Sequence, residues 1–107
     1  MVNLIDERQT GLITLLTAVT TTQRSSIFDL GFIADRMTWE VIVTGGPTMS
    51  VTLEGSIDGT RLYALDTTTG STMRHVVNKP VRYICANLTS LSGGTNPTVT
   101  VVFIGKG

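Results

Sequence analysis

The sequence predicts an all-β protein: a single antiparallel β-sandwich, similar to a jelly roll, of about eight short strands preceded by an N-terminal arm. Threonine alone supplies 19 of the 107 residues, and β-branched side chains suit the pleated surface of a strand. Apolar and polar residues alternate with a period of two in several segments, as expected of strands with one buried face. Clusters of Gly, Pro, Asn and Ser separate these segments at intervals of about ten residues, which is typical of a β-sandwich.

The N-terminal part of the chain gives the weakest pattern. Residues 1–11 show no periodicity and are predicted to form an arm at the edge of the domain, and residues 12–107 form the sandwich. The segment 12–19, LITLLTAV, fits a helix by the spacing of its leucines, but its threonines and its β-rich context favour a strand. A second strand is predicted at 26–31.

The strands in the middle of the chain are the clearest. In the segment RMTWEVIVT, Met37, Trp39 and Val41 share one face with Val43, while threonines and a glutamate occupy the other. This alternation places Trp39 in the core. Comparable patterns, bounded by turn residues such as Gly45-Gly46-Pro47 and Asn78-Lys79-Pro80, complete the prediction. The predicted strands are 36–44, 48–56, 61–66, 71–77, 81–89 and 98–105.

The segment EGSIDGTRLYAL, residues 54–65, contains many side chains that could bind a metal or take part in catalysis. However, Asp58-Gly59 is a pair typical of tight hairpin turns, because glycine readily adopts a positive φ. A calcium ion needs six to eight oxygens, usually from several acidic residues in one loop, and this segment offers too few. We therefore interpret it as a hairpin corner, after which Leu62 and Ala64 resume the apolar face of the returning strand.

Charge and hydropathy restrict the class of partner. Eight basic residues balance eight acidic ones, so the formal net charge is zero. A nucleic-acid-binding protein usually carries a strongly basic surface, which this composition lacks. The longest apolar run is far below the roughly 20 residues of a membrane-spanning helix. We therefore expect neither a nucleic acid nor a membrane as partner.

The sequence offers little support for catalysis. An activated nucleophile usually needs a histidine base that a third group holds in place, and His75 is the only histidine, with no such group nominated by the sequence. Cys85 is the only cysteine and lies within a predicted strand, so we interpret it as a structural thiol. One histidine and one cysteine are too few for a zinc site. We predict a non-enzymatic protein with no metal and no cofactor; a hydrolase that uses His75 as its base is an alternative.

Two stretches of the chain carry a family resemblance: VTLEGSIDGTRLYAL, residues 51–65, and PVRYICANLTSLSGGTNPTVTVVFIGKG, residues 80–107. Together they resemble small β-sandwich virion proteins of tailed bacteriophages. The resemblance covers residues 36–107 and implies a capsid decoration or cement protein. Such a protein binds the major capsid protein or other virion proteins on the head surface, bridges capsomers, and is often a trimer. Assembly would take place in the cytoplasm of the bacterial host.

The same pattern of a strand, an Asp-Gly turn and an aromatic residue also occurs in discoidin-like and carbohydrate-binding sandwiches. A module that recognises glycans of the host surface is therefore the alternative function. In that pattern an aromatic residue often precedes the position of Tyr63, where this chain has Leu62. Tyr63 is the aromatic residue that we expect to contact a ligand or a partner.

The residues predicted to contact a partner come from the arm and from the outward faces or loops of the sandwich. Arginine and tyrosine are favoured because they are enriched at the hot spots of protein interfaces. The predicted contact residues are Asn3, Leu4, Ile5, Asp6, Glu7 and Arg8 in the arm, with Arg24, Arg61, Tyr63 and Arg74 in the sandwich.

Overall fold

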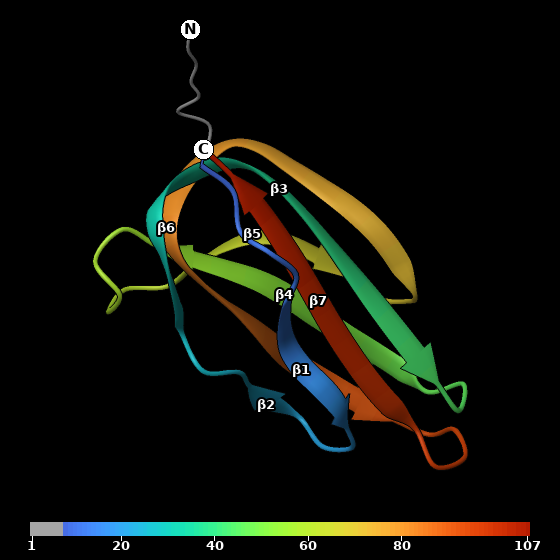
Figure 1. Ribbon diagram of the computed structural model, residues 1–107. Helices are drawn as coiled ribbons and strands as arrows, with labels where there is room; N and C mark the ends of the chain where they lie inside the picture. The colour runs from blue at the N-terminus through green and yellow to red at the C-terminus, as the bar shows by residue number, and fades with distance from the viewer. Residues whose placement is uncertain (1–7) are drawn as a thin grey trace, which may run out of the picture.

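The computed structural model describes residues 8–107, which form strands joined by turns and contain no helix (Figure 1). All paired strands run antiparallel, so the predicted fold class is confirmed. The strand order is β1-β7-β3-β6-β4-β5, with β2 paired to β6. The strands are β1 (Ile13–Val19), β2 (Gln23–Arg24), β3 (Phe28–Thr44), β4 (Thr48–Ser56), β5 (Tyr63–Thr68), β6 (Thr72–Ser92) and β7 (Thr98–Lys106).

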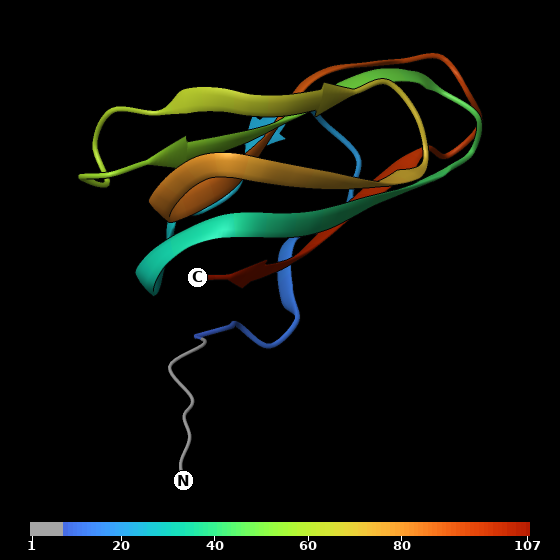
Figure 2. The same ribbon diagram turned by 90° about the horizontal axis from the view of Figure 1, so that it is seen from above.

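The long strands β3 and β6 bend, and their bends divide the sheet into two layers. The first part of β6 pairs with β3, from Thr72 to Val77, whereas its last part pairs with β4, from Tyr83 to Ser92. We call β1, β7, the C-terminal half of β3 and the N-terminal half of β6 the first layer. The second layer contains β4, β5, β2 and the C-terminal half of β6. Figure 2 shows β4 and β5 on one side of the molecule and β3 and β7 on the other.

These bends explain why the strand boundaries differ from those predicted. Gly31 in β3 has a φ of 82°, and Asn78 in β6 has a φ of 63°. The register between β3 and β6 shifts next to Gly31, between Asp29 and Ala34. Glycine and asparagine tolerate a positive φ in a bulge as well as in a turn, so here they bend a strand instead of ending it. Consequently β3 contains residues 28–31 of the predicted strand 26–31 and all of 36–44. In the same way, β6 contains residues 72–77 of the predicted strand 71–77 and all of 81–89.

The hydrophobic core lies between the two layers. Alternate residues of β3 and of β4 point into it, as the sequence predicted, and Trp39 is only 1% exposed. A large apolar side chain that is fully buried contributes about 1.5–3 kcal/mol relative to exposure, so this interior is the main source of stability. The core residues from the central strands are Met37, Trp39, Val41, Met49, Val51, Leu53, Ile84, Ala86, Leu88, Val99, Val101 and Phe103.

The predicted arm, residues 1–11, lies partly outside the described residues. Its last part is hydrogen-bonded to the end of β7: the Thr10 N–H donates to the Gly105 carbonyl over 2.8 Å, and the Gly107 N–H donates to the Arg8 carbonyl over 2.8 Å. The first described residues therefore lie beside the C-terminus (Figure 1). Residues 8–10 therefore lie against the end of β7, and the rest of the predicted arm is outside the described residues.

Candidate interaction surfaces

The predicted contact residues lie at several separate places. Asn3, Leu4, Ile5, Asp6 and Glu7 are outside the described residues, and Arg8 is exposed beside the end of β7. Arg24 lies on β2 and Arg74 on β6, whereas Arg61 and Tyr63 lie at the β4–β5 hairpin. Arg24, Arg61 and Arg74 each pair with a carboxylate of the same chain.

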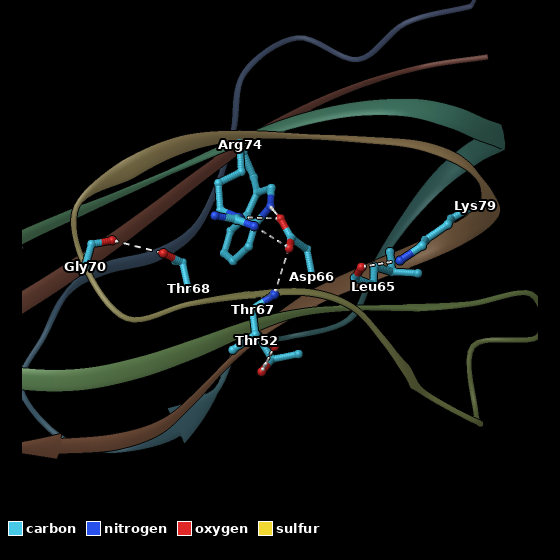
Figure 3. Close-up of polar contacts among 9 residues, drawn as sticks. Thr52, Leu65, Asp66, Thr67, Thr68, Gly70, Arg74 and Lys79 are labelled. Carbon is cyan, nitrogen blue, oxygen red and sulfur yellow. Dashed lines mark hydrogen bonds and ion pairs between the residues drawn. The ribbon is translucent and has the colours of Figure 1, made fainter.

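Arg74 belongs to a network that joins the two layers (Figure 3). Its Nε donates to Asp66 Oδ2 over 2.7 Å and its Nη2 donates to Asp66 Oδ1 over 3.0 Å, a bidentate pair. The indole N–H of Trp39 also donates to Asp66 Oδ2, over 3.0 Å. Asp66 comes from the second layer, while Arg74 and Trp39 come from the first. The network therefore closes the open side of the sandwich, where β5 faces β6.

One further contact holds β5 at this side, because the Lys79 Nζ of β6 donates to the Leu65 carbonyl over 2.7 Å (Figure 3). Within β5, the Thr67 N–H donates to Asp66 Oδ1 over 3.0 Å. Partial burial would raise the pKa of Asp66, but the hydrogen bonds from Arg74 and Trp39 outweigh it and keep the pKa below its ordinary value of 3.8. Asp66 is thus a structural carboxylate that accepts several donors.

Arg24 covers a second carboxylate, on the outer side of the second layer. Its Nε donates to Glu54 Oε1 over 2.8 Å, and the thiol of Cys85 donates to the same oxygen over 3.5 Å. Burial opposes ionisation of Glu54, but the hydrogen bonds from Arg24 and Asn87 keep its pKa below the ordinary value. Burial, together with the Glu54 carboxylate, raises the pKa of Cys85 to about 12. Cys85 is therefore a protonated, buried thiol and not a nucleophile.

The acidic residue at the β4–β5 connection organises the turn. Asp58 Oδ1 accepts the backbone N–H groups of Thr60 and Arg61 over 2.9 and 3.0 Å and the hydroxyl of Ser56 over 2.9 Å. The backbone N–H groups of Arg61 and Thr60, followed by the Ser56 hydroxyl, hold the pKa of Asp58 well below its ordinary value. Gly59 supplies the positive φ, 78°. The interpretation of this segment as a hairpin corner agrees with these contacts.

The same connection projects from the body of the molecule (Figures 1 and 2). Three of its large side chains are exposed. We call Ile57, Arg61 and Tyr63 the hairpin tip; all three are exposed, Tyr63 by 66%. The guanidinium of Arg61 reaches Asp58 Oδ2 over 2.8 Å and stays at the surface. On the returning strand Leu65 is buried and Ala64 is exposed, so the prediction that Ala64 lies on the inward face is wrong.

Among residues 8–107, no group of three or more His, Cys, Asp or Glu side chains is placed to hold a metal ion. His75 lies on the outer side of the first layer, where its Nδ1 is 2.9 Å from the hydroxyl of Thr38. Within the same residues, no helix is present that could cross a membrane.

The sequence reasoning missed one surface, the outer side of the first layer. Met73, Val77 and Ile104 are exposed there. A hollow of about 330 Å³ lies between Val77, Ile104 and residues 9–10. A signal was available in the sequence, because the segment TVTVVFI is apolar on both faces of its strand, with Val102 and Ile104 opposite the core residues. Strands that are covered on both faces are typically apolar on both.

No protein-family model matches this chain, and no curated protein matches it. Similar solved structures exist, although their sequences are only distantly related. The SPBc2 prophage-derived protein YomS is 16% identical, with a TM-score of 0.71 over 99% of each chain. The PBSX exported protein XepA is 13% identical, with a TM-score of 0.76 over 98% of this chain and 40% of its own.

Two further similar structures come from Clostridium perfringens. CpGH89CBM32-6 is 17% identical, with a TM-score of 0.58 over 88% of this chain and 76% of its own. A family 89 glycoside hydrolase in complex with PUGNAc is 15% identical, with a TM-score of 0.61 over 91% of this chain but only 14% of its own. At these identities the similarity concerns the fold alone.

Proposed function

We propose that this chain is a non-enzymatic structural protein of a phage particle, a capsid decoration protein that binds the major capsid protein on the head surface and bridges capsomers. The observation that supports this best is the length of the structural match. YomS, a prophage-derived protein, corresponds to this chain from end to end, over 99% of each. In the glycoside hydrolase, by contrast, the corresponding part is 14% of a much larger protein.

The hairpin tip is the surface that we assign to the capsid. Ile57 and Tyr63 expose apolar area, and Arg61 adds a cation beside them. Tyrosine and arginine are enriched at interface hot spots, and an exposed aliphatic side chain gains most from being covered by a partner. In this proposal the protein acts by binding alone and catalyses no reaction. An interface of standard size buries roughly 1,600 Å² in total, and a homo-oligomer that presents several tips adds avidity.

Particles assembled with and without this protein test the proposal. The wild-type chain should be present in stoichiometric amounts in purified particles, and the purified chain should rebind saturably to particles that lack it. The paired substitution Arg61→Ala and Tyr63→Ala should weaken rebinding by about tenfold or more. Ile33→Ala, which removes an aliphatic side chain exposed elsewhere, is the matched control. A chain that is absent from particles and does not rebind to them contradicts the proposal.

A carbohydrate-binding module is the second candidate, and a specific observation favours it. CpGH89CBM32-6 corresponds to this chain over most of both lengths, and Tyr63 offers an exposed ring on which a sugar can stack. Binding on a glycan array that Tyr63→Ala abolishes would support this function. An array that shows no binding by the wild-type chain removes it.

A further inference from the structure

The outer side of the first layer is a regular grid of side chains. On β3, Arg36, Thr38 and Glu40 point outward, because the residues between them are buried in the core. Thr38 is in register with His75 of β6 on one side and with Ile104 of β7 on the other. This middle row is the centre of the grid.

The two rows that flank Thr38 carry opposite charges beside apolar side chains. Arg36 is in register with Val77, and Glu40 is in register with Met73. Met73 is 60% exposed and Val77 is 55% exposed. One flanking row thus contains Arg36 and Val77, and the other contains Glu40 and Met73.

The third column, on β7, is mainly apolar. Val102 lies beside Glu40 and Ile104 beside Thr38, while Lys106 lies beside Arg36. Ile104 is 44% exposed. Leu12 borders the same column and encloses, with Val102 and Ile104, a second hollow of about 130 Å³. Exposed apolar side chains that adjoin in this way mark a surface that a partner covers.

Two charged side chains of this face, Glu40 and Arg36, can bind an oppositely charged group of a partner. The carboxylate of Glu40 is exposed and has no hydrogen-bond or ion-pair partner among residues 8–107. The guanidinium of Arg36 is exposed, donates from Nη2 to the Gly107 carbonyl over 3.0 Å and lies 3.7 Å from the Asp35 carboxylate, so it can still accept another anion. Arg36 lies two residues before Thr38 and Glu40 lies two residues after it. A rotation by 180° about an axis through Thr38 therefore exchanges the positions of Arg36 and Glu40.

We propose that a second copy of this chain docks on this face, turned by 180° about an axis that lies in the plane of the interface and crosses the strands at Thr38. This rotation reverses each strand and keeps it opposite the same strand of the partner. Arg36 then faces the partner's Glu40, and Glu40 faces the partner's Arg36. Val77 faces the partner's Met73, and Ile104 faces the partner's Ile104.

The dimensions suit this arrangement. Along a strand the rise is about 3.3 Å per residue, so Arg36 and Glu40 are roughly 13 Å apart and the two ion pairs flank an apolar centre. Stacked sheets lie about 10 Å apart, a gap that the long side chains of arginine, glutamate and methionine fill. Self-complementary patches of this kind generate closed two-fold dimers. The pairing does not depend on the capsid-binding role, and it gives a dimer where the resemblance to phage proteins implies a trimer.

Charge reversal and mixing test the pairing on the full-length chain, with sedimentation velocity as the readout. The wild-type chain should form a dimer whose population rises with concentration. Glu40→Arg places two arginines opposite each other and Arg36→Glu places two glutamates opposite each other, so the dissociation constant of each variant alone should rise by about tenfold or more. An equimolar mixture of the two variants should dimerise again, because every facing pair in the mixed dimer is then of opposite charge.

The mixing experiment separates interface effects from folding effects, because a variant that fails to fold cannot be rescued by another. Ile33→Glu, at an exposed position elsewhere, is the control and should dimerise like the wild type. A wild-type chain that is monomeric at all concentrations, or trimeric, overturns the proposal. A dimer whose dissociation constant changes with neither Glu40→Arg nor Arg36→Glu also overturns it. The same holds if the chain is a monomer and either substitution abolishes its rebinding to particles.

Discussion

Replacing Asp66 with alanine removes the acceptor that Trp39 and Arg74 share. The indole N–H of Trp39 donates to Asp66 Oδ2 over 3.0 Å, and Trp39 is 1% exposed, so water has little access to replace the lost acceptor. A buried donor left unsatisfied costs about 1–3 kcal/mol. We therefore expect Asp66→Ala to lower the free energy of unfolding by about that amount. In a domain of this size, each kcal/mol corresponds to a fall in Tm of roughly 4–8 °C.

Urea denaturation followed by tryptophan fluorescence measures this effect directly, because Trp39 is the only tryptophan and lies within the network. Asp66→Asn keeps a carbonyl oxygen that can accept the indole N–H, so it should lose less stability than the alanine variant. Arg82→Ala is the control, because the pair of Arg82 with Asp29 is exposed and surface pairs contribute little, while Asp29 keeps the hydrogen bond from the Gly31 N–H. A midpoint for Asp66→Ala equal to that of the wild type, or to that of Arg82→Ala, would refute the assignment of Asp66 as the shared acceptor.

Three further outcomes are expected. The pKa values of the paired carboxylates in the folded state, that of Asp58 above all, lie below their ordinary values. The stability that these carboxylates contribute is therefore fully present above about pH 5 and is lost as the pH falls. The unfolding midpoint, measured as a function of pH, should show this loss. Gly45→Ala should destabilise the fold by more than about 1 kcal/mol, since its φ is 87° and a Cβ would overlap the Thr95 carbonyl, whereas Gly70→Ala, with open space around it, should change little in the same melts. The thiol of Cys85 should react with a thiol reagent only in denaturant, and fast reaction of the native protein would contradict its burial.

The sequence predicts the strands of this fold best where one face is buried and the other is exposed. The alternation around Trp39 identifies β3 because every second side chain enters the core. The bends at Gly31 and Asn78 could not be distinguished from turns, because the same residues permit both. On β5 the inward position is Leu65 and not Ala64, since a register shift opposite Leu53 displaces the alternation by one residue.

The interaction surfaces were harder to predict, because a pairing between distant residues leaves no local pattern. Arg24 pairs with Glu54, 30 residues further along the chain, and so appeared to be a free surface cation. The outer face of the first layer depends on the register of three strands, which only the folded chain reveals. The exposure of Tyr63 could be predicted because a hairpin turn lies immediately before it, and its contact with a partner stays a prediction.

The contacts along β5 also limit the ways in which copies of this protein can associate. β5 is the last strand in the strand order. An edge strand whose backbone N–H and C=O groups lack hydrogen-bond partners can pair with a strand of another copy, and repeated pairing of this kind builds a fibril. Here the ammonium of Lys79 occupies the Leu65 carbonyl and the Asp66 carboxylate occupies the Thr67 N–H. These two contacts disfavour the addition of a strand at this edge, and so disfavour open-ended growth through β5.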